Sequence, residues 1–335
     1  MVSPKISIVM PVKDTAQYVG KTIQSILDQS FENWELIAVN DQSNDDSLAV
    51  MESFNDPRII VKTNPNAGLL RALRFGYSLS SGDLITRMDS DDLMPDYKLE
   101  IMYNEWKKHG KGTVITGGAE YFMDEGEVGD GFNRYVNWLT MISRTNTHAQ
   151  HIYKESVIAS NCSLVHRDDF DACGGFEPDT FPEDYDLCFR FYESGFHLVG
   201  VNEIVHLWRD REDRISRNWD EYKDNRFLAL KTHYFDKLER DSNRPLVIWG
   251  AGRNGKDIVR LMQEKGESSI HWICDNENKI GKDIYDIRMQ HFDALKLIDN
   301  PQVIIAVASP ADQNMIESHL KYLNKVAGSD YWFFS

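Results

Sequence analysis

Short apolar runs alternate with amphipathic segments along the first third of the chain. The run Ile6–Val12 is rich in β-branched residues and has no polar face, which is typical of a strand buried on both sides. Within 18–28, the apolar residues Val19, Ile23 and Ile26 recur at helical spacing. The two patterns together predict strands at 6–12, 35–39, 58–62 and 83–88 and helices at 18–28, 48–54 and 68–79. This β-α-β-α-β order predicts an α/β fold with a parallel sheet and helices on both of its faces.

The remaining chain divides at a polar linker, 241–245. Before the linker, 120–160 is less periodic and is interpreted as loops with one helix around 135–142. The other elements predicted there are a strand at 161–166, a turn at 174–176 and helices at 183–194 and 221–238. After the linker a second α/β pattern begins, with strands at 246–249, 270–274 and 303–307, a glycine turn at 250–255 and helices at 256–265 and 315–323. We therefore predict two domains, 1–240 and 245–335.

The formal net charge of the chain is −16. A surface of this charge repels polyanions, so we expect no nucleic acid partner. An acidic protein can still bind a nucleotide when a divalent cation lies between its carboxylates and the phosphates. The N-terminus lacks the features of a signal peptide, and no stretch approaches the ~20 apolar residues of a transmembrane helix. The four cysteines show no metal-ligand spacing, so we expect a cytoplasmic protein with reduced thiols.

Acidic residues follow three of the predicted strands, at Asp14, at Asp41 and in the cluster Asp89-Ser90-Asp91-Asp92. In open α/β sheets, ligands bind beyond the carboxyl ends of the strands, so these acids are expected to lie at one rim. Asp89 and Asp91 have D-x-D spacing, and two such carboxylates can hold one Mg²⁺ or Mn²⁺ against a diphosphate. The structural alternative is an acidic turn that caps the helix after Pro95. The position of the cluster after a buried strand favours a function.

The first part of the chain resembles family 2 glycosyltransferases, which have the GT-A fold. The resemblance is carried by six motifs in order over about the first two thirds of the chain. They are Ile8-Val9-Met10-Pro11-Val12-Lys13-Asp14, Ser25-Ile26-Leu27-Asp28-Gln29-Ser30-Phe31, Val39-Asn40-Asp41-Gln42-Ser43-Asn44-Asp45, Asn66-Ala67-Gly68-Leu69, Met88-Asp89-Ser90-Asp91-Asp92, and Gly174-Gly175-Phe176 followed by Glu183-Asp184-Tyr185-Asp186-Leu187. It implies a GT-A domain and the transfer of a sugar from a nucleoside-diphosphate sugar.

The resemblance also implies roles for single residues. Pro11 and Asp14 would border the nucleoside pocket, and Asp41 would accept a hydrogen bond from the base, such as N3–H of uracil or thymine. Asp89 would face the ribose or the water shell of the metal, and Asp91 would ligate the metal directly. The further substrate-binding residues implied are Asn66, Gly68 and Arg71; for Arg71, an exposed helix arginine is the alternative.

Glu183 and Asp184 form the second chemical centre that the resemblance implies. Inverting transfer needs a base on the face opposite the leaving phosphate, and in the family the second acid of this pair has that role, which is Asp184 here. Negative charge at the start of a helix is the structural alternative, and we accept it as part of the role of Glu183. One departure concerns a histidine of the family's metal site, because Arg211 stands at its position. Arginine cannot ligate a cation, but it can bind a diphosphate in a bidentate way.

The C-terminal domain carries G-x-G-x-x-G at Gly250, Gly252 and Gly255, between a predicted strand and a helix, and Asp275 follows the next strand. In that context the motif indicates nucleotide binding. The domain resembles the Rossmann-like domains of nucleotide-sugar dehydratases and sugar acetyltransferases. The alternative is a domain that keeps the tight turn without a ligand. Because it has only about 90 residues, we favour an accessory or assembly role.

The sequence therefore predicts an inverting glycosyltransferase that uses a nucleoside-diphosphate sugar, with UDP or dTDP as the nucleotide, and Mn²⁺ or Mg²⁺ as cofactor. Its expected acceptor is a glycan or a lipid-linked glycan in surface polysaccharide or lipopolysaccharide synthesis. The alternatives are a nucleotide-sugar oxidoreductase or dehydratase and an inactive scaffold that binds a sugar nucleotide. The sequence leaves open whether the protein forms a homo-oligomer and whether it associates peripherally with the inner face of the cell membrane.

Overall fold

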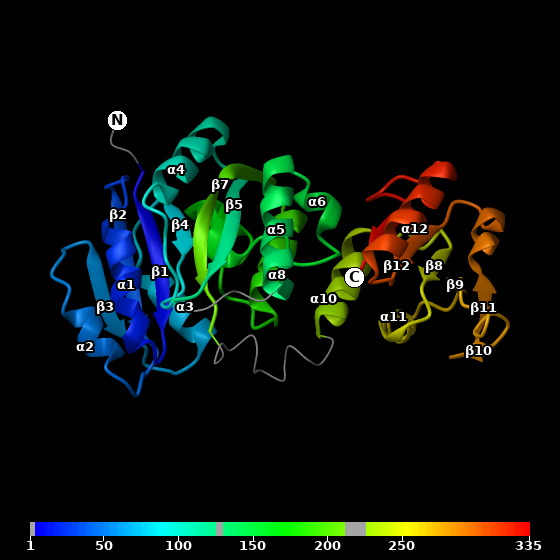
Figure 1. Ribbon diagram of the computed structural model, residues 1–335, viewed down its shortest axis with the longest axis horizontal. Coiled ribbons are helices and arrows are strands. Elements are labelled where there is room, and N and C mark those ends of the chain that lie inside the picture. The colour runs from blue at the N-terminus through cyan, green and yellow to red at the C-terminus, as the bar shows by residue number, and fades with distance from the viewer. Residues whose placement is uncertain (1–3, 125–129, 212–225) are drawn as a thin grey trace. The chain divides into compact units, whose positions relative to one another are not determined.

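The computed structural model describes residues 4–124, 130–211 and 226–335. The chain forms two compact units, each with a sheet of its own (Figure 1). Unit 1 comprises 1–148 and 157–218, and unit 2 comprises 149–156 and 219–335. The two domains predicted from the sequence, 1–240 and 245–335, are divided at the polar linker. That division stays a prediction.

Unit 1 is built on a seven-stranded sheet with the order β3-β2-β1-β4-β6-β5-β7. The first four of these strands are parallel, as the sequence predicts, and β6 then runs antiparallel to both β4 and β5. The sheet is therefore mixed beyond β4. The strands are β1 (Ile6–Val12), β2 (Trp34–Asn40), β3 (Ile59–Thr63), β4 (Leu84–Arg87), β5 (Thr113–Phe122), β6 (Ser163–His166) and β7 (His197–Arg209).

The helices of unit 1 connect these strands and cover the sheet. Helix α3 packs on β1 and β2 at very short range, because a Cβ atom on Gly76 would lie 2.9 Å from side-chain atoms of both Val9 and Val39. The helices are α1 (Ala16–Leu27), α2 (Ser47–Glu52), α3 (Leu69–Leu79), α4 (Lys98–His109), α5 (Asp130–Thr145), α7 (Arg167–Ala172), α8 (Glu183–Glu193) and the short η1 (Ser160–Cys162). The first four strands and three helices lie within a few residues of their predicted positions.

The two long strands β5 and β7 are absent from the predicted elements. They pair in parallel, with a break in register between Thr116 and Ala119, so that neither strand keeps a regular alternation of buried and exposed positions. In β7 the polar residues Asn202 and Glu203 interrupt the apolar pattern. The hydrophobic period that identifies a strand is therefore missing from both sequences.

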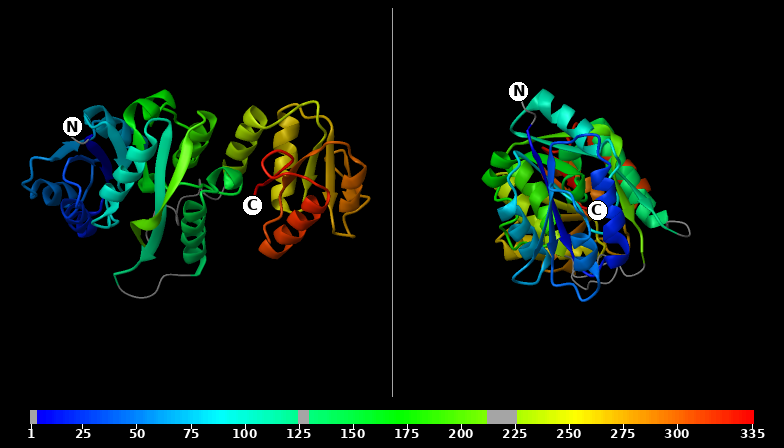
Figure 2. Two further views of the ribbon diagram at one scale, coloured as in Figure 1. Left: turned by 90° about the horizontal axis from the view of Figure 1, so that it is seen from above. Right: turned by 90° about the vertical axis from the view of Figure 1, so that its left-hand side faces the viewer.

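Unit 2 contains a six-stranded sheet with the order β10-β11-β9-β8-β12-β13, parallel except at the β10–β11 pair. Ile316 and Leu320 of α12 pack on the face that carries Val247, Trp249 and Ile305. Figure 2 shows α11 (yellow) and α12 (red) on the two sides of this sheet. The elements are α6 (His148–His151), mostly in this unit, α10 (Arg226–Leu238), β8 (Leu246–Trp249), α11 (Arg253–Glu264), β9 (Ile270–Cys274), β10 (Asp283–Ile284), β11 (Ile287–His291), η3 (Phe292–Leu297), β12 (Gln302–Ile305), α12 (Pro310–Tyr322) and β13 (Tyr331–Phe333).

Among the helices that the structure describes, none has both the length and the apolar character that crossing a bilayer requires.

A buried carboxylate ties the amino ends of three strands in unit 1 together. Glu35 of β2 accepts hydrogen bonds from Ser7 Oγ (2.7 Å) and from the backbone N–H groups of Ser81 (2.5 Å) and Gly82 (3.1 Å), and its other oxygen contacts the ammonium of Lys5. Burial by itself would raise the pKa of Glu35, but the hydrogen bonds from Lys5, Ser7 and Ser81 lower it to about 2. The ionised form of Glu35 therefore stabilises the folded state.

Replacing Glu35 with Gln is expected to lower the stability of the protein at pH 7. The pKa falls from 4.5 in a free carboxyl to about 2 in the folded protein. The stabilisation, ~3 kcal/mol by linkage, is present above pH 4.5 and is lost as the pH falls toward 2. Urea unfolding at pH 7 and pH 3 measures the difference between wild type and Glu35→Gln, which should shrink by more than half at pH 3. The exposed Glu52→Gln variant is the control; an equal difference at both pH values would contradict the role of the charge.

Candidate active site

The D-x-D loop follows β4, and Asp92, the acid directly after Asp91, binds it to the rest of unit 1. Asp92 is fully buried, with Oδ2 2.8 Å from His206 Nε2, and its Oδ1 accepts a hydrogen bond from the backbone N–H of Arg209 at 2.8 Å. Leu93 and Leu207 exchange backbone hydrogen bonds of 3.0 Å. These contacts fix the loop to β7, an element that the sequence did not predict.

Arg209, at the end of β7, holds the backbone of Asp91. Its Nε donates to the Asp91 carbonyl oxygen at 2.7 Å, and its guanidinium lies over the rings of Phe122 (4.5 Å) and Tyr18 (4.9 Å). The side chain is 1% exposed and forms an ion pair with Asp124. The position of Asp91 therefore depends on a buried arginine that lies more than a hundred residues further along the chain.

The side chain of Asp91 faces Arg211, with Oδ2 3.1 Å from Nε. Both side chains are partly open to solvent, and the Arg211 guanidinium lies 5.2 Å from the ring centroid of Tyr18. The structure thus places the positive charge of Arg211 at the carboxylate that the sequence predicts as a metal ligand.

The described residues contain no group of three or more His, Cys, Asp or Glu side chains arranged to hold a metal ion. Mg²⁺ and similar hard cations are commonly held by one or two carboxylates together with substrate phosphates and water, without a closed protein cage. Asp91, partly exposed after a parallel strand, provides a carboxylate of that kind. The donor set therefore fits a divalent cation that is shared with a phosphate-bearing substrate.

The partners of Asp89 differ from those of Asp91. Its Oδ1 accepts a hydrogen bond from Arg87 Nη2 and its Oδ2 accepts one from Asn161 Nδ2, both at 2.9 Å. The backbone carbonyl of Asn161 accepts a hydrogen bond of 2.6 Å from the buried Lys98. Asp89 is thus held by protein groups on both of its oxygens.

Arg87 joins the D-x-D loop to the Glu183-Asp184 pair through Glu183. Besides Asp89, it contacts Ser160 Oγ (2.8 Å) and lies 3.7 Å from Glu183 Oε1. It is the last residue of β4, so the same strand end that begins the D-x-D loop also presents this cation. Arg87 is not among the residues predicted from the sequence, although a charge at the end of an apolar strand was a signal that could have identified it.

Glu183 and Asp184 open helix α8, directly after Pro182. Together with Arg87 they line a small cavity that is bordered by Leu70 at the start of α3 and by the turn at Gly175. The Tyr185 backbone N–H donates to Asp184 Oδ1 at 2.8 Å.

The charge state of Asp184 is set by these neighbours. Burial raises the pKa of Asp184 first and the negative charge of Glu183 raises it further, while Arg87 opposes both, and the resulting pKa is about 7. A carboxyl group with this pKa exchanges a proton readily at neutral pH, which suits a general base.

The predicted nucleoside-binding residues form a second group. Asp41 is buried, and its Oδ1 accepts hydrogen bonds from Asn64 Nδ2 (2.7 Å) and from the Gly68 backbone N–H (2.9 Å). Gly68 has φ +132°, a conformation that favours glycine, and it precedes the first residue of α3. Asp41 therefore shapes the loop that contains Asn66.

The other residues of this group lie nearby in the fold. Asp14 has φ +49°, and its Oδ1 accepts a hydrogen bond of 2.6 Å from the Asn44 backbone N–H. Pro11 is buried in β1, and Asn66 and Arg71 are exposed. Since Leu70 lines the Asp184 cavity, the start of α3 brings this group near the second chemical centre.

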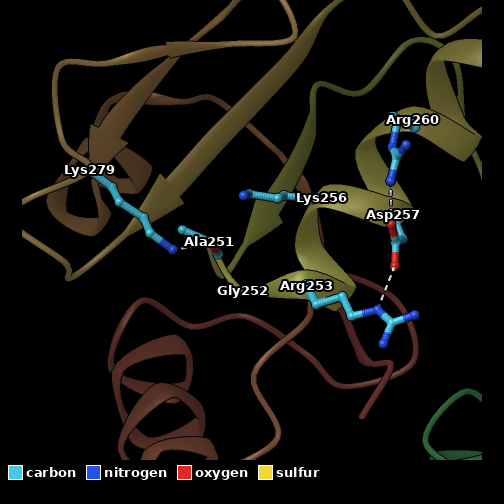
Figure 3. Close-up of a pocket in the computed structure, with 7 residues that line it drawn as sticks. All are labelled: Ala251, Gly252, Arg253, Lys256, Asp257, Arg260 and Lys279. Carbon is cyan, nitrogen blue, oxygen red and sulfur yellow. Dashed lines mark hydrogen bonds and ion pairs between the residues drawn. The ribbon is translucent and has the colours of Figure 1, made fainter.

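The glycines of the C-terminal motif lie in unit 2. Gly250 and Gly252 form the turn between β8 and α11, Gly255 lies in the first turn of α11, and Asp275 is exposed just after β9. This turn borders a cavity, which Figure 3 shows and which Asp275 does not line.

The chain is similar in sequence and in structure to known glycosyltransferases. The chain is 27% identical over 236 residues to the putative glycosyltransferase EpsE of Bacillus subtilis, covering 68% of this chain and 81% of EpsE. It is similar in structure to S. aureus TarS 1-349 in complex with UDP-GlcNAc (TM-score 0.55, 15% identity, 79% of this chain and 73% of that one). It is also similar to the mannosyltransferase PcManGT from Pyrobaculum calidifontis in complex with GDP-Man and Mn²⁺ (TM-score 0.53, 15% identity, 80% and 71%).

These likenesses support a GT-A glycosyltransferase fold for the N-terminal part of the chain. The family described as Glycosyl transferase family 2 matches residues 7–174, which is half of the chain. The chain therefore belongs to glycosyltransferase family 2.

Proposed function

We propose that this glycosyltransferase moves a sugar from a nucleoside-diphosphate sugar to an acceptor hydroxyl with inversion, and that Asp184 is the base. The observation that carries the proposal is the placement of Asp184 in a small cavity beside Glu183 and Arg87, with its pKa raised to about 7. Arg87 also contacts Asp89, so the D-x-D loop and Glu183, the neighbour of the proposed base, share one cation.

In the proposed reaction, the acceptor oxygen attacks the anomeric carbon from the face opposite the diphosphate. A new carbon–oxygen bond forms, the bond to the phosphate oxygen breaks, and the acceptor proton passes to the Asp184 carboxylate. The nucleoside diphosphate leaves with the bonding electron pair. Arg211 would contact the diphosphate in a bidentate way, a role that is supported by its position at Asp91.

We propose Asp91 as the protein ligand of a divalent cation, Mn²⁺ or Mg²⁺, with Asp89 in its outer surroundings. When bound, such a cation neutralises the charge that develops on the departing diphosphate. The proposal is supported by the partly exposed carboxylate of Asp91 and by the Mn²⁺ that is bound in the related mannosyltransferase.

For the nucleotide we propose UDP or dTDP, held by the loops of Pro11, Asp14, Asp41 and Gly68. Asp41 and Gly68 contact each other, so the predicted base acceptor and the loop before α3 form one structure. TarS, a structural neighbour, binds UDP-GlcNAc. A glycan or lipid-linked acceptor, surface polysaccharide or lipopolysaccharide synthesis and a cytoplasmic location at the membrane stay predictions that rest on the family resemblance. Donor hydrolysis by the purified protein distinguishes this function from an inactive scaffold.

Asp184→Asn is expected to bind donor about as well as the parent and to transfer sugar at least ~100-fold more slowly, because it keeps the size of the side chain and removes its basicity. Glu183→Gln is the matched control and should cost less in the chemical step. Single-turnover transfer to an identified acceptor, with equal folded fractions, measures both. Near-parental transfer by Asp184→Asn together with an inactive Glu183→Gln would move the base to Glu183.

The pH dependence of transfer should report the same base. Because the Asp184 carboxylate is the active form and its pKa is about 7, kcat/KM should rise with pH and level off above 7. Removing the charge of Glu183 lowers the pKa of Asp184, so the rise should move to lower pH in Glu183→Gln. A profile that is identical in the two proteins would argue that Asp184 does not take the proton.

Asp91→Ala is expected to abolish UDP binding that depends on Mn²⁺, because it removes the proposed ligand. Calorimetric titration with UDP, with and without Mn²⁺, measures this difference. The exposed Asp28→Ala variant has the same change in charge and should bind like the parent. If folded Asp91→Ala retains the Mn²⁺ effect, the assignment of Asp91 is wrong.

A further inference from the structure

Unit 2 contains a cavity of about 510 Å³ beside the glycine turn after β8 (Figure 3). Its wall carries four cationic side chains, from Arg253, Lys256, Arg260 and Lys279, and one acidic side chain, from Asp257. This balance contrasts with the net charge of −16 of the whole chain. The cavity is thus a local concentration of positive charge in an acidic protein.

The cations differ in how they are compensated. Arg260 donates to Asp257 at 2.7 Å and Arg253 lies 3.9 Å from the same carboxylate. Lys279 reaches across the turn and donates to the Ala251 carbonyl oxygen at 2.6 Å. Lys256 forms no side-chain hydrogen bond or ion pair with any residue of 4–124, 130–211 or 226–335. Figure 3 shows the amino groups of Lys256 and Lys279 extending toward each other beside Ala251.

The placement of these charges is unfavourable for the helix alone. Helix α11 begins at Arg253 and has no acidic residue in its first turn, so two cations, Arg253 and Lys256, lie at the positive end of the helix dipole. Cations are stabilising at the opposite end of a helix, so these two charges oppose the dipole of α11. An anion in the cavity would convert this repulsion into attraction.

Two glycines of the turn have different roles: Gly255 allows close packing of the helix, and Gly252 leaves the cavity open. A Cβ atom on Gly255 would lie 2.1 Å from the Gly250 carbonyl oxygen, so the close approach of helix and turn requires glycine there. Gly252 has φ −75°, and a Cβ atom on it would meet nothing within 4 Å. Neither backbone strain nor packing requires glycine at 252. A missing side chain at this position leaves the cavity open beside the backbone.

The topology places the cavity where ligands bind in such sheets. β8 lies between β9 and β12, so the chain leaves β8 toward one side of the sheet and later returns to its other side. The carboxyl end of β8 is therefore a switch point of the sheet.

We propose that this cavity binds a nucleoside diphosphate, with its phosphates between Lys256, Lys279 and the start of α11. The two lysines and two arginines of its wall favour a polyanion, and the volume lies in the range of pockets for small organic ligands, well above that of a single phosphate ion. A dinucleotide binds across two halves of a larger sheet. The described part of unit 2 provides one glycine turn of this kind, which favours a nucleoside diphosphate over a dinucleotide. The inference concerns unit 2 and does not rest on the function proposed for the D-x-D loop.

The test is hydrogen exchange of the full-length protein with UDP and, separately, ADP, in EDTA to suppress cation-dependent binding elsewhere. Either nucleotide should protect peptides that cover 249–262 and 276–282. Gly252→Asp introduces a carboxylate at the position before α11, where Asp is a favoured helix cap, so the fold should be kept while the anion is repelled. Lys256→Gln removes the uncompensated cation.

Both variants should weaken nucleotide binding at unit 2 by about tenfold or more, the loss expected for a charge-assisted contact. Lys321→Gln, on the exposed side of α12, has the same change in charge as Lys256→Gln and should bind like the parent. Protection around 85–95 reports the D-x-D loop, so the two units are read separately in one experiment. The proposal is overturned if neither nucleotide protects unit 2, if inorganic phosphate protects it equally well, if NAD binds more tightly, or if folded Gly252→Asp binds like the parent.

Discussion

Carboxylates gather at one edge of the sheet of unit 1, and arginines hold them there. Asp89, Asp91 and Glu183 would repel one another if they faced only apolar strands, because like charges at short range in a partly buried site are costly. Arg87 lies between Asp89 and Glu183, and Arg211 lies at Asp91. The site can therefore be assembled before a substrate arrives, and its acids keep defined positions.

The partners of each carboxylate also explain why the pKa of Asp184 is raised. Asp89 has cationic or amide partners on both oxygens, whereas Asp184 accepts a hydrogen bond from the Tyr185 backbone N–H and lies beside Glu183. Burial and the negative charge of Glu183 raise the pKa of Asp184. The other carboxylates lie directly at arginine side chains. Two neighbouring types of carboxylate thus suit two tasks, binding a charged donor and accepting a proton.

Unit 2 shows the reverse pattern of charge. At the start of α11 the cations outnumber the acids, and Lys256 has no partner among the described residues. In unit 1 the protein supplies the compensating charge itself, and in unit 2 the proposed nucleotide would supply it.

The sequence by itself determined the elements whose patterns are local. The parallel strands β1 to β4, helix α3 and the start of α8 follow from apolar periodicity, and family motifs pointed to Asp91 and Asp184. It did not reveal β5 or β7, because their pairing breaks register and their apolar pattern is irregular. Only the tertiary structure brings His206 and Arg209 of β7 to Asp92 and Asp91, and Arg87 to Glu183. These contacts join residues up to 118 positions apart. The strength of an interaction between two charges depends on their distance and burial, which only the tertiary structure determines.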